Sequence, residues 1–243
     1  MFKKAFTLAE VLITLAIIGV VAAMTIPTLI SNYKKHEVET KLVKFYSVIN
    51  EAVKLSEIDN GEMVHWDRFM DQEAFYHKYL EKYLKVAKAE PMTSLMYAVY
   101  FQDGTGMVLY RPSETSSLHM QFYLNAKDIL TDNLTNGKDF FVFYFYNDKG
   151  ENLSYGTYLC NSPHLNSGLG FQPYIYYAAN TTYDHEKKCQ RVIVPATSDE
   201  WKDAMMNDSF NGCASNGANK GAFCTELIRR NGWKIPDDYP YRF

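Results

Sequence analysis

Residues 3–34 read KKAFTLAEVLITLAIIGVVAAMTIPTLISNYK, and this stretch decides how the rest of the chain can be organised. Glu10 and Lys34 enclose a run of 23 residues without a formal charge. As a helix rising 1.5 Å per residue, residues 11–30 span about 30 Å, which is the thickness of the hydrocarbon core of a bilayer. The sequence therefore predicts a helix that can cross a membrane.

Three simpler explanations of this apolar run compete: a secretory signal peptide, a core helix of a soluble domain and a plain membrane anchor. A secretory signal peptide has a shorter apolar core followed by a small-residue cleavage site. A core helix of a soluble domain would need burial on all of its faces. A plain membrane anchor explains Lys3 and Lys4 as cytoplasmic charges, but it does not explain Glu10, because a carboxylate in a membrane-spanning helix is costly and usually has a function or a partner.

The helix is expected to continue beyond the apolar run. Polar and charged residues separate an apolar stripe at spacings of three and four, which is typical of an amphipathic helix packed on a protein core. The stripe consists of Val38, Leu42, Phe45, Ile49 and Val53. The turn signal Asp59-Asn60-Gly61 predicts the end of the helix. A helix from Phe6 to about Ile58 would be roughly 80 Å long.

The remainder of the chain predicts an α+β head with an antiparallel sheet. Aromatic residues make up 15% of the sequence, which favours strands with wide apolar faces. The expected elements are a helix at 66–87, a hairpin at 96–111 turning at 103–106, strands at 118–124 and within 140–159, and helices at 199–208 and 222–232. We expect FVFYFY (141–146) to be a central strand buried on both faces, because it carries no charge.

Composition and motifs give no indication of an enzyme or a cofactor. A net charge of −3 offers no electrostatic reason to expect a nucleic-acid partner. The sequence has no G-x-S-x-G motif, no P-loop and no dinucleotide fingerprint, and its six histidines are scattered. No C-x-x-C pair points to a metal. Residues 147–152, NDKGEN, could hold calcium, but an N-D-x-G turn between strands is the more common arrangement.

The layout of the N-terminus, Lys-Lys-Ala followed by Phe-Thr-Leu-Ala-Glu and a long apolar helix, resembles the type IV pilins and the pseudopilins of type II secretion systems. The resemblance covers residues 3 to about 33. It implies that a prepilin peptidase cuts between Ala5 and Phe6 and N-methylates Phe6. It also implies that Glu10 pairs with the Phe6 amine of a neighbouring subunit, and that Gly19 and Pro27 are positions where the helix loosens or bends. Ala5 departs from the family pattern, which usually has Gly before the cut.

The resemblance also implies an organisation and a location for the chain. Residues 1–5 would be the leader, with Lys3 and Lys4 as its charges, residues 6–33 the transmembrane and assembly helix, and residues 34–243 the head. The protein would be a single-pass inner-membrane subunit with its head in the periplasm or outside the cell. Its partners would be the prepilin peptidase, other pilin or pseudopilin subunits and the inner-membrane assembly platform.

The sequence is compatible with more than one function. These residues do not distinguish a type IV pilin from a type II secretion pseudopilin. A head of this size slightly favours a minor component of the filament. The alternative class is a membrane-tethered extracytoplasmic enzyme or a sugar-binding or adhesion module, which would use the helix only as an anchor. Convergent polar residues in a deep pocket of the head would favour that alternative.

The four cysteines and the C-terminal tail complete the expectations for the head. An exported head suits disulfides, and pairing Cys160 with Cys189 and Cys213 with Cys224 closes the shortest loops among three connectivities. Four reduced, buried thiols are the alternative. The tail resembles that of a group of prepilin-like proteins from Gram-negative bacteria. We expect its apolar residues to pack on the sheet rather than to bind a ligand; these are Trp233, Ile235 and Tyr239.

Overall fold

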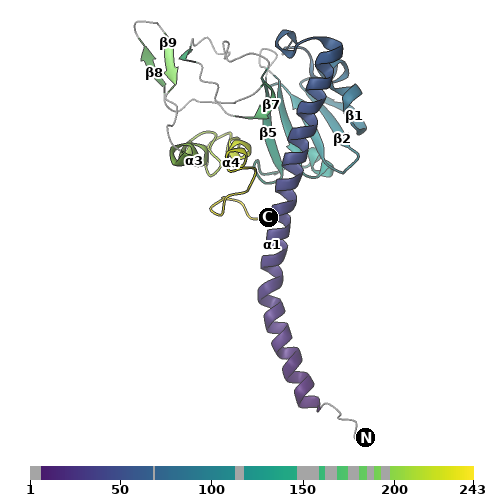
Figure 1. Cartoon of the computed structure of the whole chain (residues 1–243), viewed down its shortest axis with the longest axis vertical. Coiled ribbons are helices and arrows are strands. Elements are labelled where there is room, and N and C mark those ends of the chain that lie inside the picture. Colours follow the sequence, from purple (N-terminus) through teal and green to yellow (C-terminus); the bar gives the residue numbers. More distant parts are fainter. Residues whose placement is uncertain are drawn as a thin grey trace.

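The computed structural model describes residues 7–67, 69–112, 118–146, 159–161, 169–174, 181–184, 189–192 and 198–243. For residues 159–161, 181–184, 189–192 and 198, only the backbone is described. A single long helix projects from a mixed α+β head, and the described C-terminus lies beside this helix where it leaves the head (Figure 1). This is the pilin-like α+β arrangement that the sequence predicts.

The long helix, α1, runs from Leu8 to Asn60 and is continuous through Pro27. The backbone N–H of Gly61 donates to the Glu57 carbonyl, and φ of +78° at Gly61 ends the helix at the predicted turn. We call residues 8–33 the apolar half and residues 34–60 the amphipathic half. All five residues of the predicted stripe are buried, so the head packs on the amphipathic half as expected.

The main sheet has six antiparallel strands in the order β1-β2-β3-β4-β5-β7. Their bounds are Val86–Thr93 for β1, Met96–Phe101 for β2, Gly106–Tyr110 for β3, His119–Tyr123 for β4, Phe140–Tyr146 for β5 and Gly170–Pro173 for β7. The predicted hairpin is confirmed, with Val99 opposite Met107 and Tyr100 opposite Gly106. A separate small sheet has the order β6-β9-β8, formed by Leu159–Asn161, Cys189–Val192 and Thr181–Asp184.

Strand β5 differs from the expectation in its position and, on one face, in its burial. It lies next to the edge strand β7 rather than in the middle of the sheet. Phe141, Phe143 and Phe145 are fully buried in the cluster that contains the stripe of α1, and Val142, which points to the other face, is also buried. On that other face Tyr144 and Tyr146 are only half-buried, so the prediction of burial on both faces is correct for one face and only partly correct for the other.

The segment 66–87 corrects a prediction. Only residues 72–83 are helical, as α2 (Gln72–Phe75), the π-helical turn η2 (Tyr76–Leu80) and the 3-10 turn η3 (Glu81–Tyr83). The helix begins late because the Asp71 carboxylate accepts the N–H of Glu73 at 2.9 Å and that of Ala74 at 3.2 Å. Val86 begins β1. Its charged residues and Pro91 are not typical of a strand, but β1 is an edge strand, where proline is tolerated.

Short helical elements complete the head. These are η1 (Met63–His65), η4 (Ala126–Leu130), α3 (Ser198–Asn207) and α4 (Cys224–Arg230). The two C-terminal helices match their predictions, and Gly232, with φ of +68°, follows the end of α4. The core lies between the amphipathic half of α1 and the sheet, where Phe45 stacks on Phe122 with 4.0 Å between ring centroids.

Candidate functional site

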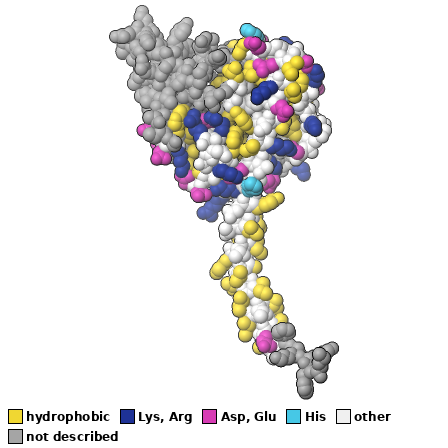
Figure 2. All heavy atoms as spheres, in the orientation of Figure 1, with side chains coloured by type: hydrophobic (Ala, Val, Ile, Leu, Met, Phe, Trp, Pro, Cys, Tyr) yellow, Lys and Arg dark blue, Asp and Glu magenta, His cyan; other side chains and the backbone are white. Residues whose placement is uncertain are grey.

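The apolar half of α1 is the most distinctive surface of the molecule. Within the described residues, α1 alone is long and apolar enough to cross a membrane, and its most apolar window has a mean hydropathy of 2.3 with none of its residues buried. Large apolar side chains gather along the face of this segment that Figure 2 shows. Leu15 is 60% exposed and Ile18 is 63% exposed. A surface of this kind needs lipid or other apolar helices around it.

The polar group at the start of this surface is held by a capping box. The Glu10 carboxylate accepts the backbone N–H of Thr7 at 2.9 Å and the Thr7 hydroxyl at 2.8 Å. In return, the Glu10 N–H donates to the Thr7 hydroxyl oxygen at 3.3 Å. This arrangement satisfies N–H groups that would otherwise lack partners at a helix start. The pattern Thr-x-x-Glu was readable in the sequence as a capping box, and the sequence analysis missed it.

Two further residues of the apolar half were singled out, Gly19 and Pro27. A Cβ added to Gly19 would meet nothing within 4 Å, so no contact with the described part of the chain requires a glycine there. Pro27 has no N–H to donate to the carbonyl of Ala23, yet α1 remains helical on both sides of it. Neither residue contributes to the packing of the head.

The expected processing residues lie outside the described part of the chain. They are Lys3, Lys4, Ala5 and Phe6. The described chain begins at Thr7, whose N–H is bound by Glu10. The carboxylate of Glu10 is therefore directed towards the N-terminal end of the helix, where Phe6 is attached.

The C-terminal third is fastened by one described disulfide. Cys213 is bonded to Cys224 with 4.7 Å between the Cα atoms, as the sequence analysis expected for this pair. The bond joins the loop after α3 to the first residue of α4. The side chains of Cys160 and Cys189 lie outside the described residues, so their pairing stays a prediction. The possible calcium loop, residues 147–152, also lies outside them.

The tail after α4 contacts α1, which the sequence did not predict. The Glu39 carboxylate of α1 accepts the Lys234 ammonium at 2.8 Å and the Ile235 N–H at 2.9 Å. The ring of Trp233 lies 4.9 Å from that of Tyr46, so this tryptophan contacts the helix. These contacts fix the tail at the point where α1 leaves the head.

Electrostatics strengthen this junction. Burial of Glu39 disfavours its charge, but hydrogen bonds from Lys234 and the Ile235 N–H outweigh that cost, so the pKa of the carboxyl lies below its ordinary value. A second ion pair joins Lys35 and Asp237 at 3.2 Å between Nζ and Oδ1. Among the described residues, no group of three His, Cys, Asp or Glu side chains could hold a metal ion.

Two family models match parts of the chain. The model of the prokaryotic N-terminal methylation motif matches residues 1–26, which is the prepilin-type signal of type IV pilins and pseudopilins. Such a signal makes the chain a prepilin-like substrate and implies processing by a prepilin peptidase.

The rest of the chain matches a second model, described as a family of unknown function (DUF6613), over residues 28–192 and 170–243. No curated protein and no solved structure matches the chain. The second model spans more than half of the sequence, and the chain therefore belongs to the DUF6613 family, with a prepilin-type signal at its N-terminus.

Proposed function

We propose that this protein is a prepilin-like structural subunit. A prepilin peptidase would remove residues 1–5 between Ala5 and Phe6 and methylate the new amine of Phe6. Residues 6–33 would hold the subunit in the inner membrane, and residues 34–243 would form a head in the periplasm or outside the cell. Extraction by an assembly platform would then place it in a type IV pilus or a type II secretion pseudopilus.

The proposal rests on the exposed apolar half of α1. The core of the head is complete without this half of the helix. Every buried residue of α1 lies between Val38 and Ser56. Residues 8–33 are therefore available for lipid and, after extraction, for the same segment of other subunits. An anchor alone would not need the N-terminal methylation motif that precedes this segment.

The geometry of Glu10 supports an assembly role for this acid. Its carboxylate is turned towards Thr7, and cleavage before Phe6 would create an ammonium one residue further on. A buried carboxylate and a buried ammonium are each expensive alone and much cheaper together. The pair could form within one subunit in the membrane and be exchanged between subunits during assembly.

The size of the head bears on the kind of subunit. Residues 34–243 include a six-stranded sheet, a second small sheet and two C-terminal helices, which is large for a subunit repeated throughout a filament. We therefore favour a minor component. Gly19 and Pro27, which have no packing role inside the chain, would allow the helix to loosen or bend during assembly.

Processing is tested by the intact mass of the full-length protein after co-expression with a prepilin peptidase. The expected mature chain begins at N-methyl-Phe6 and lacks five residues. Loss of Lys3 and Lys4 changes the formal charge from −3 to −5. A mature protein that retains Met1 would overturn the assignment, and cleavage after Ala23 would indicate a secretory signal peptide instead.

Assembly is tested by Glu10→Ala in cells that carry the cognate machinery. Loss of one member of a buried ion pair typically costs about 3–5 kcal/mol, so incorporation into sheared filaments should fall strongly. Cleavage, membrane insertion and head folding should not change. Thr14→Ala is the matched control, because it removes a polar group one turn later whose hydroxyl bonds only backbone carbonyls of α1. Normal incorporation of Glu10→Ala would favour a simple membrane tether.

A further inference from the structure

The C-terminal tail, residues 233–243, is attached to the rest of the molecule at two places. The first place is α1, where the Glu39 carboxylate accepts the Lys234 ammonium at 2.8 Å and the Ile235 N–H at 2.9 Å. Glu39 is buried, so release of the tail would deprive a carboxylate with little access to water of two donors. Both bonds require the tail to pass beside α1 at this height.

The second place is the region of the disulfide, further along the tail. The Tyr241 hydroxyl donates to the Cys213 carbonyl at 3.1 Å. The Tyr239 hydroxyl donates to the Gly137 carbonyl, in the loop before β5. Tyr239 is buried, and burial raises the pKa of its hydroxyl well above the ordinary value of 10, so the group remains a donor. A buried hydroxyl needs an acceptor of this kind.

Gly137 lies against the disulfide itself. A Cβ placed on this residue would be 2.3 Å from Sγ of Cys224 and 3.1 Å from the Tyr239 hydroxyl oxygen, so no methyl group fits between them. Cys213 and Cys224 are both fully buried. Two separate thiols need more room than a disulfide, because bonded sulfur atoms lie well inside their van der Waals contact distance. The unbonded pair would therefore displace Gly137, and with it the acceptor of the Tyr239 hydroxyl.

Helix α4 provides a second connection between the disulfide and the tail. Cys224 is the first residue of this helix, which ends at Arg230. The Trp233 N–H donates to the Ile228 carbonyl at 2.8 Å as the chain leaves the helix. The ring of Trp233 then lies 4.9 Å from that of Tyr46 on α1. The position of α4 thus sets where the tail begins, and the disulfide fixes α4 at its first residue.

We propose that the tail is a strap that holds α1 firmly only after the Cys213–Cys224 disulfide has formed. Formation of the bond removes two protons and two electrons from the thiols, and a partner disulfide accepts them and becomes two thiols. In the cell this acceptor would be a thiol–disulfide exchange protein of an oxidising compartment. Before oxidation, residues 35–46 of α1, where the helix leaves the head, would lack the cover of the tail.

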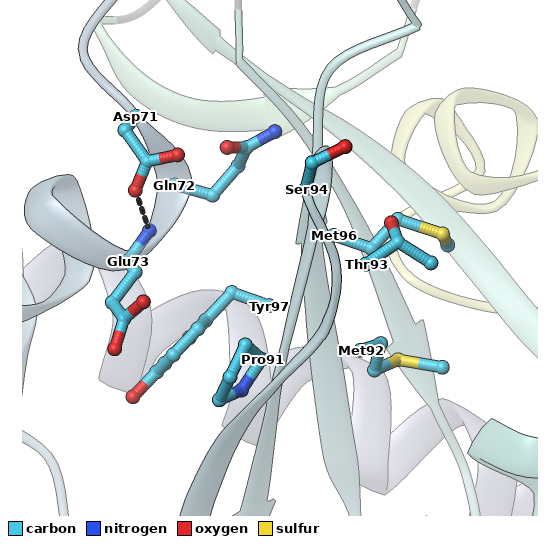
Figure 3. Close-up of a pocket in the computed structure, with 9 residues that line it drawn as sticks. All are labelled: Asp71, Gln72, Glu73, Pro91, Met92, Thr93, Ser94, Met96 and Tyr97. Atoms are coloured by element: carbon cyan, nitrogen blue, oxygen red, sulfur yellow. Dashed lines mark hydrogen bonds between the residues drawn. The ribbon is translucent and has the colours of Figure 1, made fainter.

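The test is hydrogen–deuterium exchange of the full chain in detergent micelles, followed by mass spectrometry. The amide of Ile235, which donates to Glu39, reports on the strap. The β1–β2 hairpin is the internal reference, because none of the contacts of the tail described above involves it. Figure 3 shows Met92 and Met96 on one side of this hairpin and Tyr97 on the other, so its amides monitor both faces of the sheet.

The decisive variant is Cys213→Ser/Cys224→Ser, which prevents the bond and keeps side chains of nearly the same size as the thiols. Protection of Ile235 should fall at least about tenfold more than that of the hairpin amides, because the strap opens without unfolding of the head. Equal protection in the variant and the wild type would overturn the proposal. An equal loss in the tail and the hairpin would overturn it too, since the disulfide would then only stabilise the head as a whole.

A milder variant tests the path through Gly137 with the disulfide intact, and it decides the question if the double variant does not fold. Tyr239→Phe removes the hydroxyl bond to Gly137, so Ile235 should exchange about fivefold faster. Tyr83→Phe is the matched control, because its hydroxyl donates to Asp59 in the last turn of α1. An unchanged rate in Tyr239→Phe, or the same change in both variants, would contradict the strap.

The order of events is tested by oxidation of the wild type. The full chain is refolded with dithiothreitol and then transferred to oxidised glutathione, and samples are alkylated for peptide mapping. Protection of Ile235 should rise together with the fraction of chains in which Cys213 is linked to Cys224. Full protection before this link forms would refute the proposal. Its failure would leave the prepilin-like assignment unaffected, because that assignment rests on residues 1–33.

Discussion

The two halves of α1 have the same helical backbone but present different surfaces to their surroundings. In the apolar half, side chains such as Leu12 and Ile18 are exposed around the whole circumference. In the amphipathic half, one stripe is buried in the head, and the exposed side mixes charged residues with a few apolar ones such as Val43 and Ile58. Helix propensity alone therefore does not indicate what each half of α1 contacts. The angular distribution of the apolar residues tells which half meets lipid or other helices and which half meets its own head.

The largest expected difference between the halves concerns core truncation. Phe45→Ala removes a ring that stacks on Phe122 and lies 5.5 Å from that of Phe143, so it should destabilise the head by about 3–5 kcal/mol. Ile18→Ala, in the apolar half, should change head stability by less than about 0.5 kcal/mol. Urea unfolding of the full chain in detergent, followed by tryptophan fluorescence, measures both. Equal effects would contradict the division of α1.

The next effect concerns the segment that packs on the amphipathic half. The Cys213–Cys224 disulfide fastens α4, from which the tail reaches α1. The double variant Cys213→Ala/Cys224→Ala should lower the unfolding free energy by about 2–4 kcal/mol, mainly because the unfolded chain gains freedom. Thermal unfolding with and without dithiothreitol provides the control, since the reductant should act on the wild type and much less on the variant.

The smallest effect concerns the junction between the tail and α1. Glu39→Gln keeps the shape of the side chain but removes its charge, and it should cost about 1–2 kcal/mol at neutral pH. Glu37→Gln is the matched control, because Glu37 is half-exposed and pairs only with Lys41 in the described structure. Its change should remain below about 0.5 kcal/mol.

The pH dependence of the Glu39→Gln difference sharpens this prediction. The pKa of Glu39 is lower in the folded state than its ordinary value of 4.5. The stabilisation from its charge is therefore complete above that pH and is lost as the pH falls through the folded pKa. The difference in melting temperature between wild type and Glu39→Gln should shrink on acidification below about pH 4.5. A difference that grows on acidification would contradict the assigned ion pair with Lys234.

Local patterns were sufficient where neighbouring residues decide the structure. The stripe of α1, its end at Gly61 and the hairpin turn at residues 103–106 follow from spacing and turn chemistry that are visible within about ten residues. The capping box of Thr7 and Glu10 has an equally local signal, the pattern Thr-x-x-Glu at the start of the helix.

Patterns failed where the deciding contact is remote. Residues 66–87 contain helix-forming residues at helical spacing, but only residues 72–83 are helical, and the end of the segment begins the edge strand β1, which pairs with β2. Pairing with β2 supplies backbone hydrogen bonds that local propensity does not include, and tertiary context can override that propensity.

The sequence by itself determined the long helix, its two halves, the α+β character of the head and the prepilin-type N-terminus. Each of these depends on the period of apolar residues or on a contiguous motif. Only the tertiary structure decided that Lys234 would reach Glu39, 195 positions earlier, and that the ring of Trp233 would lie beside that of Tyr46. Such contacts join residues that are far apart in the sequence and form only when the chain folds around its core. The local spacing of apolar residues therefore cannot predict them.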